Sequence, residues 1–192
     1  MRGCSKRSVL AAISVLEGTS PNEALAKWSV PETSLRECLS ELEKGASLSG
    51  SSQMEVAIYL ALELGSTAEE IARALSWRGF EKLVGRILEE NDFRVLFNVR
   101  TKSRKEIDVV GVKGSYGISI DCKHWSRPLS RRDKESIAAL QRDRTEELSI
   151  SLGIKLYPIV VTLRGIVDEI SGVTFLPVNA LRDFLMRLGP PS

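Results

Sequence analysis

The first 76 residues carry apolar side chains three or four positions apart, the spacing of one helix face. Glycines close several of these segments. Ser20, Pro21 and Glu23 open another segment with the pattern of a capping box and a proline in the first helical turn. We therefore expect helices throughout residues 1–76, interrupted by a Gly- and Ser-rich loop at residues 45–52.

From residue 77 onward the pattern changes to a mixture of helices and strands. Residues 77–91 have an amphipathic helical pattern, with Trp77 and Phe80 expected in the core, and residues 130–152 form a long polar helix. Its inner side is expected to carry Ile137, Leu140 and Leu148. Short runs rich in β-branched residues predict strands, and one more helix closes the region: strands at 93–99, 106–112, 116–122, 155–163 and 173–176, helix at 178–188. This order predicts an α/β domain with one mixed central sheet flanked by helices.

The helical region resembles a helix-turn-helix module, but its charge argues against DNA reading. The second helix of the pair, residues 32–44, has four glutamates and only Arg36 and Lys44 as cations. A helix with net negative charge is repelled by phosphates in the major groove. A packing, dimerising or partner-binding role fits better, and sequence-specific DNA reading stays open as an alternative.

The overall charge of +2 conceals an uneven distribution along the 192 residues. Residues 1–76 hold seven Lys and Arg against ten Asp and Glu, a net of −3. Residues 94–134 hold eleven against four, a net of +7. A basic band of this kind is typical of a surface that binds a polyanion.

The numbers and spacing of cysteine and histidine limit which metal or disulfide sites the chain can form and which cellular compartment it suits. Cys4, Cys38 and Cys122 are widely spaced and include no Cys-x-x-Cys pair, so we expect neither a disulfide framework nor a zinc ribbon. A reducing cytoplasm is then the simplest location. His124 is the only histidine, so metal sites and catalytic sites that need two histidines are excluded. No stretch approaches the ~20 apolar residues of a membrane span, so we expect no membrane association.

The most informative segment is a predicted hairpin that carries acidic residues on both strands. Side chains alternate along a strand, so Asp121 and Lys123 share one face. If the hairpin turns on residues 114–115, Asp108 stands across from Asp121, and Glu106 stands across from Lys123. Facing carboxylates repel each other and do not stabilise a sheet. Their placement makes sense if they bind a divalent cation such as Mg²⁺, with Lys123 beside it to act on water or on developing charge.

Four segments, in this order, carry a resemblance to a known enzyme class: Trp77-Arg78-Gly79-Phe80-Glu81, Glu106-Ile107-Asp108-Val109-Val110, Asp121-Cys122-Lys123-His124-Trp125 and Val160-Val161-Thr162. Over residues 77–165 the chain resembles the PD-(D/E)xK nuclease superfamily, and more narrowly Mrr-type restriction endonucleases and archaeal Holliday junction resolvases. Ile107 replaces the proline of the motif, a departure that is common in this branch.

The resemblance implies a role for each matching residue and a metal cofactor, Mg²⁺ or Mn²⁺. It implies metal binding by Asp108, Asp121 and the carbonyl of Cys122, with Glu81 completing the site, and catalysis by Lys123 together with these acids. It implies a restriction-endonuclease-like fold for the α/β domain, residues 77–192, whereas the helical domain expected from the pattern, residues 1–76, lies outside the resemblance.

Basic residues on either side of the hairpin are expected to contact DNA phosphates: Arg100, Lys102, Arg104, Lys105, Arg127, Arg131 and Arg132. A plain solvated surface is the alternative for all of them. His124 is better explained as a polar strand end than as a proton carrier. Trp125 fits either stacking on a base or packing under the next loop.

The sequence thus predicts a metal-dependent endonuclease that hydrolyses DNA phosphodiester bonds, possible as a homodimer because cutting two strands needs two sites. Two alternatives come from other classes. One is a nuclease fold that has lost activity and serves as a DNA-binding or assembly subunit. The other is a helix-turn-helix regulator with an appended α/β domain.

Overall fold

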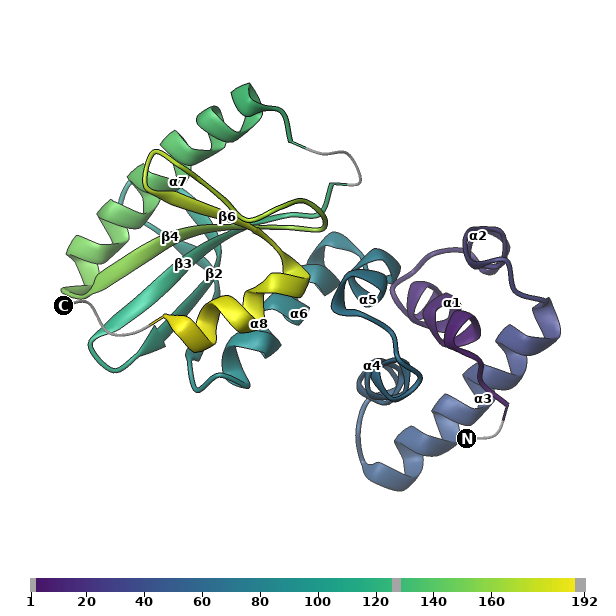
Figure 1. Ribbon diagram of the computed structural model, residues 1–192. Coiled ribbons are helices and arrows are strands. Elements are labelled where there is room, and N and C mark those ends of the chain that lie inside the picture. Colours follow the sequence, from purple (N-terminus) through teal and green to yellow (C-terminus); the bar gives the residue numbers. More distant parts are fainter. Residues whose placement is uncertain (1–2, 126–128, 189–192) are drawn as a thin grey trace. The chain divides into compact units, whose positions relative to one another are not determined.

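The computed structural model describes residues 3–125 and 129–188, and the chain divides into two compact units, Met1–Gly79 and Phe80–Ser192. Figure 1 shows the first unit as helices only and the second as a sheet with helices. The boundary between the units lies inside α6 (Trp77–Glu89), whereas the sequence places the domain boundary before Trp77. Separate functions for residues 1–76 and 77–192 stay a prediction.

The helical unit is built around α1 (Lys6–Leu16), which packs against all four other helices of the unit. These are α2 (Pro21–Trp28), α3 (Glu32–Ser49), α4 (Gln53–Glu63) and α5 (Ala68–Ala74). The capping box predicted at Ser20 is present, and the Ser20 side chain accepts a hydrogen bond from the backbone N–H three residues on; Thr67 caps α5 in the same way. Sequence patterns therefore locate most helix starts correctly.

The predicted loop at residues 45–52 is wrong, because α3 continues to Ser49. A helix-ending glycine normally adopts a left-handed conformation, which Gly50 has at φ 70° and which terminates α3 there. Gly45 lies in the helix and costs only about 1 kcal/mol relative to alanine. A glycine within a helical pattern therefore did not mark the end of the helix.

Cys4 and Cys38 form a disulfide, which corrects the expectation that the cysteines remain unpaired. Cys4 precedes α1 and Cys38 lies in α3, and their Cα atoms are 4.9 Å apart. The two residues are 34 positions apart in sequence, so only the packing of α1 against α3 brings them together. Disulfides are typical of oxidising compartments, so the cysteine spacing no longer argues for a reducing cytoplasm.

The second unit holds a six-stranded mixed sheet in the order β1-β2-β3-β4-β6-β5. The strands are β1 (Arg94–Arg100), β2 (Glu106–Lys113), β3 (Tyr116–Lys123), β4 (Lys155–Thr162), β5 (Asp168–Ile170) and β6 (Val173–Pro177). The first three are antiparallel neighbours, β3, β4 and β6 run parallel, and β5 returns antiparallel. The predicted α/β class with a mixed sheet is confirmed.

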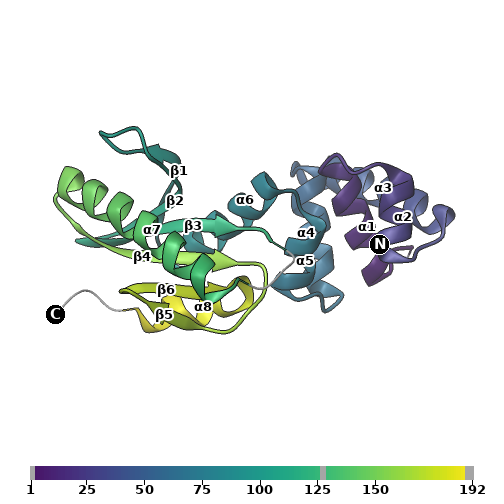
Figure 2. The same cartoon turned by 90° about the horizontal axis from the view of Figure 1, so that it is seen from above.

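Helices cover both faces of this sheet. Figures 1 and 2 show α7 (Arg131–Leu152) on one face, and α6 with α8 (Val178–Arg187) on the other. Phe80, Leu88 and Ile118 are fully buried in this core. All expected helices and strands of this unit are found, and the three-residue β5 is the one described element that the pattern does not predict.

Two expected core residues prove exposed. Leu140, placed on the inner side of α7, is 60% exposed, and Trp77 at the start of α6 is 51% exposed. The inner side of α7 instead carries Ala138, Gln141 and Thr145, with Leu148 as expected. The polar members face inward because they hydrogen-bond to buried groups of β3. Within the described residues, the helices are too short or too polar to cross a membrane.

Candidate active site

The β2–β3 hairpin has the register that the sequence predicts. Val109 pairs with Ile120 and Lys113 with Tyr116, around a turn in which Gly114 adopts φ 60°. Extending this register by one step brings Asp108 opposite Asp121. There the Asp108 carboxylate Oδ2 accepts the backbone N–H of Cys122 at 2.7 Å. The end of the hairpin is therefore where both predicted acids meet.

Asp108 is a buried carboxyl group, 8% exposed, in an environment that disfavours its charge. Burial is the main cause that raises its pKa above the ordinary value, and the like charge of Asp121 acts in the same direction. The N–H of Cys122 and the cations Lys123 and Arg144 oppose this shift of the pKa. A nearby cation would therefore relieve the cost of ionising Asp108.

Asp121, 2% exposed, is held between two cationic side chains. The Lys123 Nζ lies 2.7 Å from its Oδ2, an ion pair without hydrogen-bond geometry. The Arg144 Nη2 donates to its Oδ1 at 3.0 Å. Asp121 and Lys123 thus share a strand face, as the alternation of side chains predicts.

Arg144 is the member of this cluster that the sequence reasoning missed. It lies on α7, where Gln141, Arg144, Thr145 and Leu148 follow the spacing of one helix face. An arginine among residues that face the sheet was the available signal, because a buried guanidinium needs an acidic or carbonyl partner. The apolar pattern alone points to Leu140 instead.

Glu81 reaches the same region from α6, and its side chain is also buried, at 5% exposure. Its position shows in the Cys122 thiol, whose pKa is raised by burial first and then by the charges of Asp108, Glu81 and Asp121. Three carboxylates therefore act on one thiol at the end of β3. The structure brings Asp108, Asp121 and Lys123 together, and the Glu81 charge acts on the neighbouring Cys122 thiol, while the chemical roles of all four stay predictions.

The donor set fits a hard divalent cation, which binds through one or two carboxylates and completes its shell with water or phosphate oxygens. Asp108 and Asp121 are such a pair. Among the described residues, however, no group of three His, Cys, Asp or Glu side chains is close enough to hold a metal ion. Ligation by Glu81 or by the Cys122 carbonyl therefore stays a prediction.

A basic loop between β1 and β2 is fastened to α7. Lys102, Arg104 and Lys105 are exposed in a tight turn in which Arg104 adopts φ 63°. The backbone N–H and the hydroxyl of Ser103 each donate to the Glu147 carboxylate at 2.6 Å. These bonds lower the pKa of the Glu147 carboxyl group. Glu147 lies one helical turn from Arg144, so the loop is anchored near the acidic cluster.

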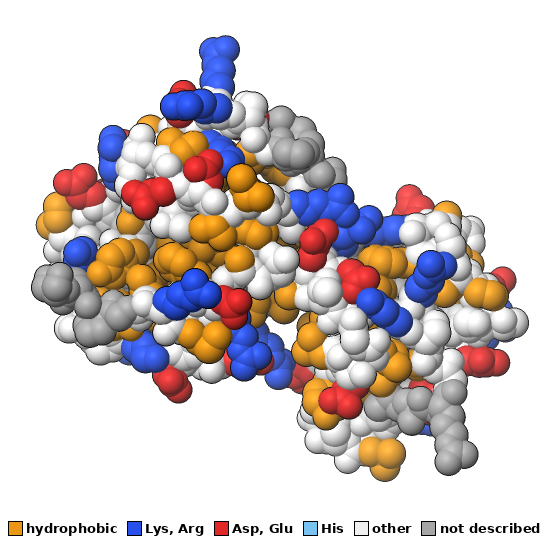
Figure 3. All heavy atoms as spheres, in the orientation of Figure 1, with side chains coloured by type: hydrophobic (Ala, Val, Ile, Leu, Met, Phe, Trp, Pro, Cys, Tyr) orange, Lys and Arg blue, Asp and Glu red, His pale blue; other side chains and the backbone are white. Residues whose placement is uncertain are grey.

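The remaining predicted phosphate contacts lie at other positions of the same unit. Arg100 is exposed and 3.4 Å from the Glu106 carboxylate. Arg131 and Arg132 are exposed at the start of α7, where Figure 3 shows Lys and Arg side chains projecting. Arg127 lies outside the described residues.

Two further predicted residues contact neighbours of the site. Lys123 Nζ is 6.0 Å from the ring centroid of Trp125, and the ring centroid of His124 is 5.2 Å from that of Phe80.

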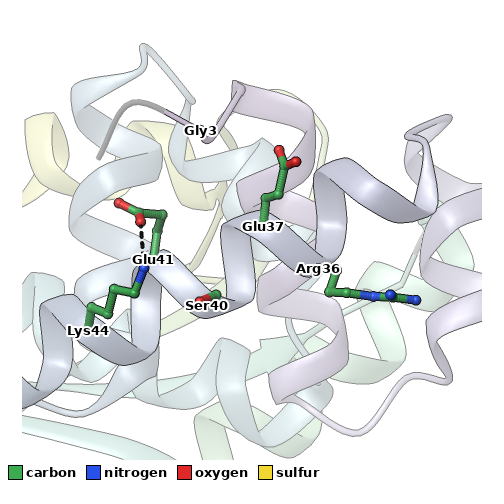
Figure 4. A pocket seen from close by; sticks show the side chains of 6 residues that line it. All are labelled: Gly3, Arg36, Glu37, Ser40, Glu41 and Lys44. Atoms are coloured by element: carbon green, nitrogen blue, oxygen red, sulfur yellow. Dashed lines mark hydrogen bonds and ion pairs between the residues drawn. The ribbon is translucent and has the colours of Figure 1, made fainter.

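A hollow of about 500 Å³ lies beside α3 in the helical unit, and Figure 4 shows its lining. Arg36, Glu37, Glu41 and Lys44 provide two charges of each sign, and Lys44 pairs with Glu41 at 3.3 Å. The hollow therefore has no preference for either charge. It is not the acidic site.

Comparisons with known proteins bear on the second unit. Residues 72–150 match the model of a family described as restriction endonuclease, Mrr_cat. This segment contains Glu81, Asp108, Asp121, Lys123 and Arg144, and the resemblance to Mrr-type restriction endonucleases is confirmed for it, whereas the resemblance to Holliday junction resolvases stays a prediction. No curated protein matches the chain.

Two solved structures are similar over part of the chain. The first, a protein of unknown function named AF1548, is 24% identical with a TM-score of 0.37, over 45% of this chain and 47% of that one. The second is the small subunit R.BspD6I2 of the heterodimeric restriction endonuclease R.BspD6I. It is 15% identical with a TM-score of 0.39, over 58% of this chain and 68% of that one. The chain therefore spans about half the length of AF1548.

Proposed function

We propose that this protein, whose residues 72–150 match the model of the restriction endonuclease family Mrr_cat, is a metal-dependent endonuclease that hydrolyses DNA phosphodiester bonds. The observation that carries the proposal is the meeting of Asp108, Asp121 and Lys123 at the end of one hairpin. Asp121 Oδ2 lies 2.7 Å from the Lys123 ammonium, and the Asp108 carboxylate accepts a hydrogen bond from the backbone N–H of the intervening Cys122.

Each residue has a chemical task in this proposal. Asp108 and Asp121 hold a divalent cation, Mg²⁺ or Mn²⁺, with Glu81 in support; when bound, the cation lowers the pKa of water and neutralises phosphate charge. Lys123 donates hydrogen bonds to the attacking water or to a phosphate oxygen, where charge develops. The expected products carry a 5′-phosphate and a 3′-hydroxyl group.

The basic residues of the second unit supply the proposed DNA contacts. The loop that contains Lys102, Arg104 and Lys105 is exposed and ordered by Glu147, so its cations are available to phosphates. A homodimer belongs to the proposal because two strands need two sites. A cytoplasmic location also belongs to the proposal, although the Cys4–Cys38 disulfide is atypical of a reducing compartment.

A cleavage assay on linear, nicked, flapped and four-way DNA with Mg²⁺ or Mn²⁺ tests this function. We expect Lys123→Ala to reduce the cleavage rate by about 100-fold or more while DNA binding persists, because the lost group acts on the transition state. Lys155→Ala is the matched control, since this exposed lysine lies at the opposite end of the β3–β4 pair. Equal cleavage by wild type and Lys123→Ala would contradict the assignment.

An inactive DNA-binding or assembly subunit is the second candidate. It is favoured by the two cations, Lys123 and Arg144, that pair with Asp121 and would compete with a metal ion for its carboxylate. This candidate predicts that the intact protein binds DNA and cleaves none of the four substrates with either metal.

A further inference from the structure

We propose that Arg144 is a positioning residue that sets Asp121 and the start of β2 in the geometry required for cation binding. This inference rests on the proposed metal-dependent function. It concerns a residue of α7 rather than of the hairpin that carries the acids.

The Arg144 guanidinium joins three separate segments of the unit. Its Nη2 donates to Asp121 Oδ1 at 3.0 Å on β3, and its Nη1 donates to the Glu106 carbonyl at 2.8 Å on β2. Its Nε donates to the Leu140 carbonyl of α7 at 3.3 Å. Glu106 is two residues from Asp108, so one side chain links the strands that carry both acids.

The two cations on Asp121 differ in how firmly they are held. Arg144 is fixed by two backbone carbonyls, and its side chain is only 17% exposed. Lys123 contacts Asp121 Oδ2 at 2.7 Å through an ammonium that is a compact charge on a flexible stem. Oδ2 is therefore the oxygen whose partner can be exchanged, while Oδ1 stays bound to Arg144.

Charge and positioning make opposite predictions about Arg144. A positive group beside a cation site weakens attraction for the cation, so its removal would tighten binding if only charge mattered. Groups that orient metal ligands have the contrary effect, and their loss weakens metal affinity by about 10- to 100-fold. The sign of the change thus separates the two roles.

The experiment measures Mn²⁺ binding to the full chain by isothermal titration calorimetry. We expect Arg144→Leu and Arg144→Lys to bind Mn²⁺ about tenfold more weakly or worse than wild type. Lysine keeps the charge but lacks the planar fork that reaches Asp121 and the Glu106 carbonyl together. Arg142→Leu is the matched control, because Arg142 is exposed on the same helix and carries the same charge.

Equal or tighter Mn²⁺ binding by either Arg144 variant would overturn the inference. If Arg144→Leu fails to fold, Arg144→Lys alone decides between the two roles, since it preserves the charge beside Asp121. Wild-type protein that binds no Mn²⁺ would overturn the proposed function itself, and this inference with it. Wild-type binding that the Arg144 variants retain would overturn only the role of Arg144.

Discussion

Two buried aspartates at the hairpin end have contrasting partners. Asp121 has a cation on each carboxylate oxygen, whereas Asp108 has one neutral N–H donor and a like charge beside it. A carboxyl group with a raised pKa costs stability once it is ionised. Such a residue is expected where function, rather than stability, sets the choice of side chain.

Replacing Asp108 by asparagine should stabilise the metal-free protein and abolish metal-dependent cleavage. Asparagine can still accept the Cys122 N–H, and it removes the buried charge, for a gain of about 1 kcal/mol near pH 7. Because the pKa of Asp108 is raised, the proton it holds at low pH stabilises the fold, and that stability is lost as pH rises through the folded pKa.

The gain should therefore vanish at acid pH, where Asp108 is protonated in both the folded and the unfolded wild-type protein. Urea unfolding in EDTA at several pH values measures this difference in free energy. Asp143→Asn on the exposed side of α7 is the control for loss of one charge. A variant that is less stable than wild type at pH 7 would contradict the account of Asp108.

At the scale of elements, α7 organises the site through one polar residue on each of three successive turns. Gln141 donates to Ser119 of β3, Arg144 binds Asp121, and Glu147 holds the loop at Ser103. These three residues are three positions apart, so they lie along one side of the helix. One helix thus aligns the sheet, the acidic cluster and the basic loop.

The Glu147 contact predicts an effect on DNA binding that opposes simple electrostatics. Glu147→Ala removes a negative charge, which by itself would strengthen attraction for DNA. It also releases the loop that carries Lys102 and Arg104. DNA binding must then order this loop, and the entropic cost of doing so reduces the affinity. We expect binding of a DNA duplex in EDTA to weaken several-fold, as measured by fluorescence anisotropy at fixed salt.

Glu146→Ala is the matched control, because Glu146 is exposed on the same helix and its removal changes the charge equally. It should leave DNA affinity unchanged or raise it slightly. If both variants raised affinity to the same degree, Glu147 would act by charge alone and the anchoring role would be wrong.

For the whole molecule, the chain consists of two units with different stabilising devices. The helical unit has a disulfide that encloses α1, α2 and part of α3. The second unit has a sheet covered on both faces, and its cysteine Cys122 is free and buried. Reducing conditions should therefore affect the units unequally.

Reduction of Cys4–Cys38 should destabilise the helical unit by about 4 kcal/mol, because the unfolded chain gains the entropy that a loop of this length had lost. Hydrogen exchange should become faster in α1 and α3 and stay unchanged in β3 and α7. Cys4→Ser should reproduce this effect, and dithiothreitol should add nothing to it. Unchanged exchange in α1 after reduction would contradict the disulfide's role.

Local sequence determined the elements and the hairpin register, because helical and strand spacing, capping boxes and a glycine turn act over a few residues. For that reason the sequence alone predicted the meeting of Asp108, Asp121 and Lys123, because the position of one turn sets which residues of the hairpin face each other. Glu81 was found only through its resemblance to a family motif.

Only the tertiary structure decided the contacts between distant segments. Arg144 reaches Asp121, Glu147 reaches Ser103 and Cys4 reaches Cys38 because helices pack against a sheet or against one another, and no local spacing encodes these meetings. The inward side of α7 was misjudged for the same reason. Gln141 and Thr145 are buried by hydrogen bonds to β3, while Leu140 stays exposed, so the partners across the interface overrode the apolar pattern.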